Sequence, residues 1–169
     1  MIKKVSYIFI ISYIFLLLCG CTGNTEAFQQ PVSFYYPERV KEDGSITHVI
    51  GCEDREGIVF AGDLQLMLAS YLAGPNDPAL YSPFPDNTEL IEVSYSDGKV
   101  TLVFNESFSQ LSSLDRSIAC AGISRTCMAF TGADYVEIFA ENTLFDGVDS
   151  ILISADNLLT QDNTPINEP

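Results

Sequence analysis

The sequence is poor in the residues that carry most enzyme chemistry and most nucleic-acid binding. It contains one histidine, His48, and no tryptophan, and only 8 Lys and Arg residues stand against 23 Asp and Glu residues. The formal net charge of −15 would repel a phosphate backbone, because nucleic-acid binding needs a basic surface. This composition argues against nucleic acids as partners and leaves little material for conventional acid–base or metal chemistry.

Glycine and proline are also modest, at 11 and 8 residues, which excludes a collagen-like or proline-rich chain. What is present is an apolar fraction of 47% in a chain of 169 residues. That size and composition suffice for one domain with a single hydrophobic core.

Residues 1–20 have the organisation of a secretory signal peptide. Two lysines precede an unbroken apolar stretch at 5–18, which is shorter than the ~20 residues that span a bilayer comfortably. The tetrad L-C-G-C at 18–21 resembles the lipobox of bacterial lipoproteins. The resemblance implies cleavage before Cys21 and acylation of its thiol, as with palmitate; an uncleaved N-terminal anchor is the alternative. In both cases the domain is expected on the extracytoplasmic face of the cell membrane.

The segment 21–31 is polar and without periodicity, which predicts a flexible tether between lipid and fold. Loss of the signal peptide leaves 6 basic residues against 23 acidic ones, a net charge of −17. Anionic membrane surfaces would repel such a domain, so the acyl chains at Cys21 are expected to hold it there.

Three cysteines remain in the mature chain: Cys52, Cys120 and Cys127. An odd number cannot pair fully within one chain. Cys120 and Cys127 are predicted to be buried side chains that act as small hydrophobes. A disulfide from Cys52 to one of them is the alternative. Their spacing matches no zinc site, so no metal and no cofactor are expected.

Hydrophobic periodicity and turn residues predict the secondary structure. The predicted elements are strands at 32–36 and 46–50, a helix at 61–73, a hairpin at 91–104, a helix at 112–130, and strands at 135–140 and 151–154. The tail 156–169 is predicted to be loose.

The hairpin is the strongest local pattern, because apolar residues alternate on both sides of Asp97-Gly98. A two-residue turn at Asp-Gly is typical of a hairpin and sets the register of its strands. The expected cross-strand pairs, all on one face, are Tyr95 with Val100, Val93 with Leu102, and Ile91 with Phe104.

The helix at 112–130 is apolar in two sectors. One contains Cys120, Ile123, Cys127 and Phe130, and is expected to face the core. The second contains Leu114, Ile118, Ala121 and Met128. This second sector either packs on the helix at 61–73 or forms a contact surface for a partner.

Few side chains suggest a site. His48 has no serine or cysteine partner at a catalytic spacing and is interpreted as a surface residue. The charged run at 53–56 lacks the spacing of a calcium loop and is interpreted as a solvated face. No catalytic residue is predicted, and the protein is expected not to be an enzyme.

The order of several motifs resembles the GerMN domain family of sporulation and germination proteins. The matching segments are V-S-F-Y-Y-P at 32–37, L-A-S-Y-L-A-G-P at 68–75, A-L-Y-S-P-F-P-D-N-T-E-L at 79–90, the hairpin with N-E-S-F at 91–108, R-T-C at 125–127 and Y-V-E-I-F-A at 135–140. The resemblance implies one domain over 32–155. Its fold would be α+β, a small mixed or antiparallel sheet with two helices on one face, in an α-β-β-α-β order similar to ring-building domains, plus an N-terminal strand.

The family resemblance implies a non-enzymatic lipoprotein that assembles with other envelope proteins, as a homo- or hetero-oligomer, in sporulation or germination. The alternative is a binding protein for cell-wall glycan or a small solute. A glycan binder would need exposed aromatic rings, for which the candidates are Tyr35, Tyr36, Tyr81 and Phe84.

Overall fold

The computed structural model describes residues 30–39, 50–142, 144–145, 147–156 and 158. The predicted signal peptide, the predicted acylation site Cys21, most of the predicted tether, His48 and the tail beyond 158 lie outside these residues. The elements in chain order are β1 (Val32–Pro37), β2 (Ile50–Arg55), the 3₁₀ turn η2 (Gly57–Val59), α2 (Leu64–Leu72), β3 (Leu90–Ser96), β4 (Lys99–Phe104), the 3₁₀ turn η3 (Glu106–Gln110), α3 (Ser113–Thr131), β5 (Tyr135–Ala140) and β6 (Ile151–Ser154).

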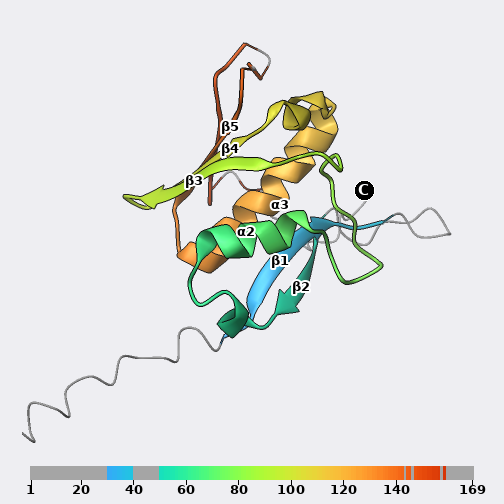
Figure 1. Ribbon diagram of the computed structural model, residues 1–169, viewed down its shortest axis with the longest axis vertical. Coiled ribbons are helices and arrows are strands. Elements are labelled where there is room, and N and C mark those ends of the chain that lie inside the picture. The colour runs from blue at the N-terminus through green and yellow to red at the C-terminus, as the bar shows by residue number, and fades with distance from the viewer. Residues whose placement is uncertain (1–29, 40–49, 143, 146, 157, 159–169) are drawn as a thin grey trace, which may run out of the picture.

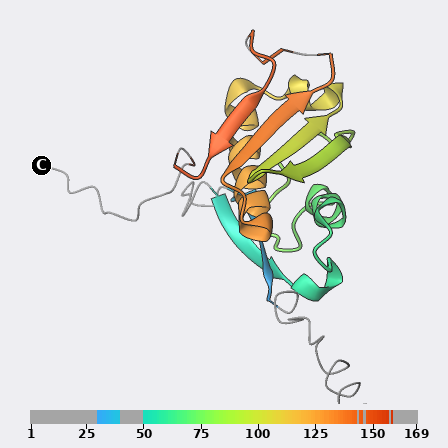
Figure 2. The same cartoon turned by 90° about the vertical axis from the view of Figure 1, so that its left-hand side faces the viewer.

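The fold is α+β, as predicted, and it contains two sheets (Figure 1). Strands β3, β4, β5 and β6 form a four-stranded sheet in that order, while β1 and β2 form a separate antiparallel pair. The hairpin β3–β4 is antiparallel, and β4 pairs in parallel with β5. Helix α3 makes the crossover between those parallel strands and covers one face of the four-stranded sheet (Figure 2).

Helix α3 also packs directly on the backbone of β1. The Tyr35 N–H donates to Thr126 Oγ1 at 2.9 Å, and the Tyr71 hydroxyl of α2 donates to the Tyr35 carbonyl at 2.8 Å. A Cβ on Gly122 would lie only 2.7 Å from that carbonyl oxygen, so glycine permits the approach. At Tyr35, the edge of β1 that does not pair with β2 therefore has both its backbone N–H and its carbonyl hydrogen-bonded to side chains of α3 and α2.

The core is rich in aromatic rings that connect the two sheets with both helices. Tyr36 of β1 stacks on Tyr71 of α2 with ring centroids 4.4 Å apart. Phe84 then links Tyr71, at 6.0 Å, to Phe104 of β4, at 5.7 Å. Since these rings come from distant parts of the sequence, their burial holds the elements together.

The predicted helices are present, with ends set by their caps. Helix α2 begins at Leu64, later than predicted, because Ala61 and Gly62 adopt positive φ angles of 46° and 79° and Asp63 accepts the capping bond. Helix α3 is capped by Ser112, as predicted, and ends at Thr131, followed by the C-cap Gly132 with its left-handed φ of 71°.

The hairpin turn is confirmed, and its register is partly wrong. Tyr95 pairs with Val100 and Val93 with Leu102, as predicted. A β-bulge between Leu90 and Glu92 places Leu90, instead of Ile91, opposite Phe104. Ile91 is therefore 49% exposed, and the expected single apolar face is broken at this end.

Strand β2 lies later in the chain than the strand predicted at 46–50, of which the structure describes only Ile50. Of the charged run at 53–56, interpreted as a solvated face, residues 53–55 instead belong to β2, and Glu56 follows the strand. The side chains of Glu53 and Arg55 are only 10% and 13% exposed, so that interpretation was wrong for both. They point inward because each neutralises the other.

Candidate interaction surfaces

The four residues of the second apolar sector of α3 lie in different environments. Leu114 is 71% exposed, and Ile118 is half-buried. Ala121 is buried, and Met128 is half-buried against the core. The Tyr71 hydroxyl of α2 approaches α3 at Gly122, which is not one of these four residues. The sector therefore offers its exposed apolar area at the beginning of the helix.

Ala121 lines a groove of about 510 Å³ between the first half of α3 and strand β6. The groove is mainly apolar, and the connection from β5 to β6 contributes Phe145 and Val148. Arg116 also lines it, with its guanidinium 5.3 Å from the centre of the Phe145 ring. Leu114 lies two helical turns before Ala121 and so on nearly the same face of α3.

Sequence reasoning did not identify Arg116, Phe145 or Val148 as parts of a surface. Arg116 lies among polar residues at the beginning of a helix, and the other two lie in a connection without periodicity. Their proximity arises from the pairing of β5 with β6, which no local pattern encodes.

The three cysteines are free, so the alternative of a disulfide at Cys52 was wrong. Cys52 is exposed on β2, whereas Cys120 and Cys127 are buried in the core, as predicted. Burial raises the pKa of Cys120 to about 12, although the Arg116 guanidinium acts in the opposite direction. Burial also raises the pKa of Cys127. Burial thus disfavours the thiolate, the nucleophilic form of cysteine, at both positions.

Glu53 and Arg55 form a structural clamp between β2 and the end of α2. Arg55 pairs with Glu53 and donates to the Ser70 and Gly74 carbonyls at 2.9 and 2.7 Å, which places a cation at the helix C-terminus. The other carboxylate oxygen of Glu53 accepts from two backbone N–H groups, of Asn76 and Asp77. The charges of Glu53 and Arg55 therefore both have partners within the fold.

A second ion pair lies on the four-stranded sheet, where Lys99 Nζ is 2.6 Å from Glu137 Oε2. The hydrogen bond from Lys99 and a second one from Ser150 lower the pKa of the Glu137 carboxyl. This pair links neighbouring strands β4 and β5.

The aromatic candidates for glycan binding do not form an open stacking surface. Tyr36 and Phe84 are buried in the core. The Arg125 guanidinium lies 4.3 Å from the Tyr35 ring centre, and Arg39 lies 5.7 Å from that of Tyr81. All four rings are thus engaged within the protein.

Within the part of the chain that the structure describes, no three His, Cys, Asp or Glu side chains gather as metal ligands. Among the same residues, none of the helices has the length and apolarity needed to cross a membrane.

Two solved structures are similar in part. A candidate lipoprotein from Clostridium perfringens has 15% sequence identity and a TM-score of 0.47, and the match covers 76% of this chain and 90% of that one. The tandem GerMN domains of the sporulation protein GerM from Bacillus subtilis have 19% identity and a TM-score of 0.49, with 79% of this chain and 47% of that one covered. This chain thus spans about half the length of the GerM structure.

None of the curated proteins matches this chain. The family Germane, described as "Sporulation and spore germination", matches residues 33–155. Because that match covers most of the sequence, the chain belongs to the Germane family.

Proposed function

We propose that this chain is a non-enzymatic lipoprotein of the extracytoplasmic membrane face, and that its Germane domain assembles with other envelope proteins during sporulation or germination. The family match over 33–155 carries the proposal. The lipobox at 18–21 supports the anchor, with Cys21 as the acylated residue.

The surface beside α3 supports a role in protein–protein assembly rather than in catalysis. Its groove is apolar, Leu114 stands 71% exposed next to it, and Val148 on the opposite wall is also exposed. An exposed apolar side chain beside an apolar groove is typical of a protein–protein contact. The proposed contact surface is therefore Leu114 with Ile118 and the groove wall at Ala121, whereas Met128 packs against the core.

The charge of the mature chain favours a basic partner. With a net charge of −17 after loss of residues 1–20, identical copies repel one another in solution. Anchoring of both partners in one membrane raises their local concentration, so that a weak interface suffices.

Two measurements test this function. Mass spectrometry of the mature N-terminus should find a diacylated or triacylated Cys21, and an unmodified chain beginning at Met1 would contradict the anchor. Crosslinking in intact membranes should join the groove surface to a partner protein. Leu114→Glu should weaken that crosslink, while Ile91→Glu, at an exposed apolar residue of β3, should leave it unchanged. Recovery of the lipoprotein alone and monomeric, also from sporulating cells, would contradict assembly.

A further inference from the structure

A second exposed apolar surface lies at the opposite end of the molecule from the groove. It is formed by Ile58 and Val59 of η2, each 60% exposed, and by Leu66 of α2, 48% exposed. Val59 and Leu66 line the same shallow depression. We call these three residues the apolar tip. Contact between apolar side chains and water is unfavourable, so burial of these three neighbouring side chains against a partner would be favourable.

The chain enters the fold at this tip. Val32, the first residue of β1, pairs with Arg55, the last residue of β2, and η2 follows two residues later. Pro31 accordingly lines one small pocket with Gly57 and Ile58. Figures 1 and 2 show the start of β1 and the η2 turn at the same end of the molecule.

The length of chain before the fold limits the distance between the tip and the lipid anchor. Nine residue steps separate Cys21 from Gln30. Even a fully extended chain of that length reaches only about 30 Å. An acylated Cys21 therefore keeps the end of the domain that carries Ile58 within that distance of the bilayer surface.

We propose that the apolar tip docks into the surface of the membrane that holds the anchor, with Ile58 and Val59 among the lipid headgroups and upper acyl chains. The inference rests on the proposed acylation of Cys21. Tethering supplies the high local concentration that two or three apolar side chains need in order to dock.

The charges around the tip give docking a characteristic salt dependence. Asp54 and Glu56, next to η2, are exposed acidic residues, and an anionic lipid surface repels them. Salt screens that repulsion but does not weaken apolar burial. Docking on anionic membranes should therefore increase with ionic strength, in contrast to the binding of a basic peripheral protein.

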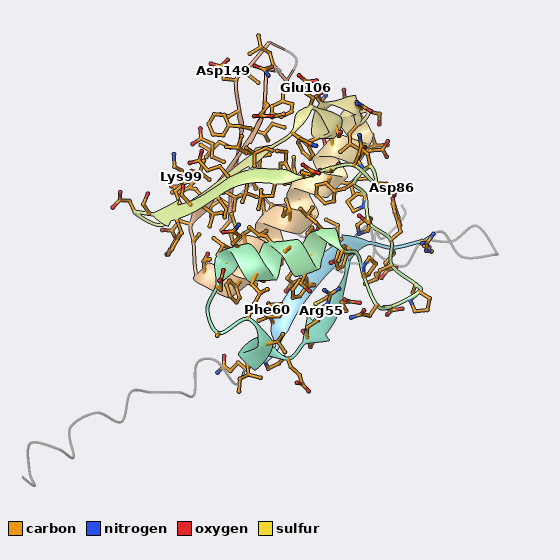
Figure 3. All side chains as sticks on the ribbon, in the orientation of Figure 1. Arg55, Phe60, Asp86, Lys99, Glu106 and Asp149 are labelled. Carbon is orange, nitrogen blue, oxygen red and sulfur yellow. The ribbon has the colours of Figure 1, made fainter. Side chains whose placement is uncertain are left out.

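Docking at the tip also orients the domain. Figure 3 labels Phe60 and Arg55 near the tip, and Glu106 and Asp149 at the other end. The groove, which includes Ser113 at the start of α3 and Val148 after β5, belongs to that other end. The docked domain therefore presents its groove away from the membrane, toward a partner.

The absence of tryptophan permits a direct test with single-tryptophan variants of the full-length, acylated protein. Ile58→Trp reports on the tip, and Leu66→Trp is a second reporter there. Leu144→Trp is the matched control, because Leu144 is 58% exposed and lies in the connection from β5 to β6 at the other end. Each variant is reconstituted into zwitterionic and anionic vesicles, with and without lipids brominated on the acyl chain, and vesicle attachment is measured by flotation.

The proposal predicts that brominated lipid quenches the two tip reporters and not the control, and that salt increases the quenching in anionic vesicles. Protein that floats with the vesicles while no reporter is quenched would overturn docking and leave the anchor intact. Tip reporters shielded from acrylamide without lipid quenching would assign the tip to a second protein copy and also overturn docking. Protein that does not float at all would refute the anchor, and docking with it.

Discussion

The contact between α3 and β1 predicts the effect of removing one hydroxyl group. Thr126 is fully buried, and its Oγ1 accepts from the Tyr35 N–H at 2.9 Å and donates to the Gly122 carbonyl at 3.0 Å. Thr126→Val keeps nearly the same shape and a similar helix propensity. The variant therefore removes the acceptor of the Tyr35 N–H together with the donor to the Gly122 carbonyl, and it changes little else.

The expected cost follows from that unpaired donor. A buried N–H without a partner costs ~1–3 kcal/mol, because its hydrogen bond to water was given up on folding. The methyl group that replaces the hydroxyl recovers at most ~0.8 kcal/mol. Thr126→Val should therefore destabilise the fold by about 1–2 kcal/mol and lower its melting temperature by roughly 3–8 °C.

Two assays on the purified protein check this reasoning. Denaturant titration measures the free energy of unfolding, and amide hydrogen exchange measures the protection of the Tyr35 N–H. Thr126→Ser is the control, because it keeps the hydroxyl and should preserve that protection even though it loses a methyl group. Unchanged stability together with unchanged Tyr35 exchange in Thr126→Val would refute the role of this hydrogen bond.

Four further predictions concern other contacts. Gly122→Ala should destabilise the protein in denaturant titration despite alanine's better helix propensity, since its Cβ would meet the β1 backbone at 2.7 Å; a stabilised variant would contradict this. Cys120 and Cys127 should react with a thiol reagent only in denaturant, and rapid labelling of both in the native protein would show that the core placement is wrong. Arg55→Met should cost about 3 kcal/mol in the same titration, because it leaves the largely buried carboxylate of its partner uncompensated; a cost near zero would mean that the clamp is not stabilising. Glu137 has a lowered pKa in the fold, so its contribution to stability should be complete above its unfolded pKa of about 4.3 and be lost as the pH falls through the lower folded value. Glu137→Gln should flatten the stability profile in that acid range, and an unchanged profile would contradict the assignment.

The outcome at the hairpin shows where local patterns stop being sufficient. Asp97 and Gly98 both adopt positive φ angles, 52° and 73°, as the turn sequence predicts. The bulge further along the strand coincides with contacts from Asn105, whose side chain and N–H bond to the backbone of Glu89. Those bonds join the residue before β3 to the residue after β4, so alternation within one strand could not reveal the extra residue.

Strand β2 is a second case in which the local sequence pattern was insufficient. A run of charged residues predicts a solvated face, since a buried charge costs free energy unless it is paired. Glu53 and Arg55 are nevertheless largely buried, because each meets the other and because the end of α2 supplies further partners. Only the tertiary structure brings those partners together.

The sequence by itself determined the α+β class, the turn at Asp97-Gly98, the caps of α3, the strands β5 and β6, the burial of two cysteines and the family resemblance. These depend on hydrophobic period, turn residues and caps, which act over a few residues. The tertiary structure alone decided that β1 pairs with β2 and docks on α3, that Arg55 lies inward, and that the groove and the apolar tip lie at opposite ends. The physical reason is that each of these depends on contacts between residues far apart in the chain, where packing and hydrogen-bond satisfaction override local preference.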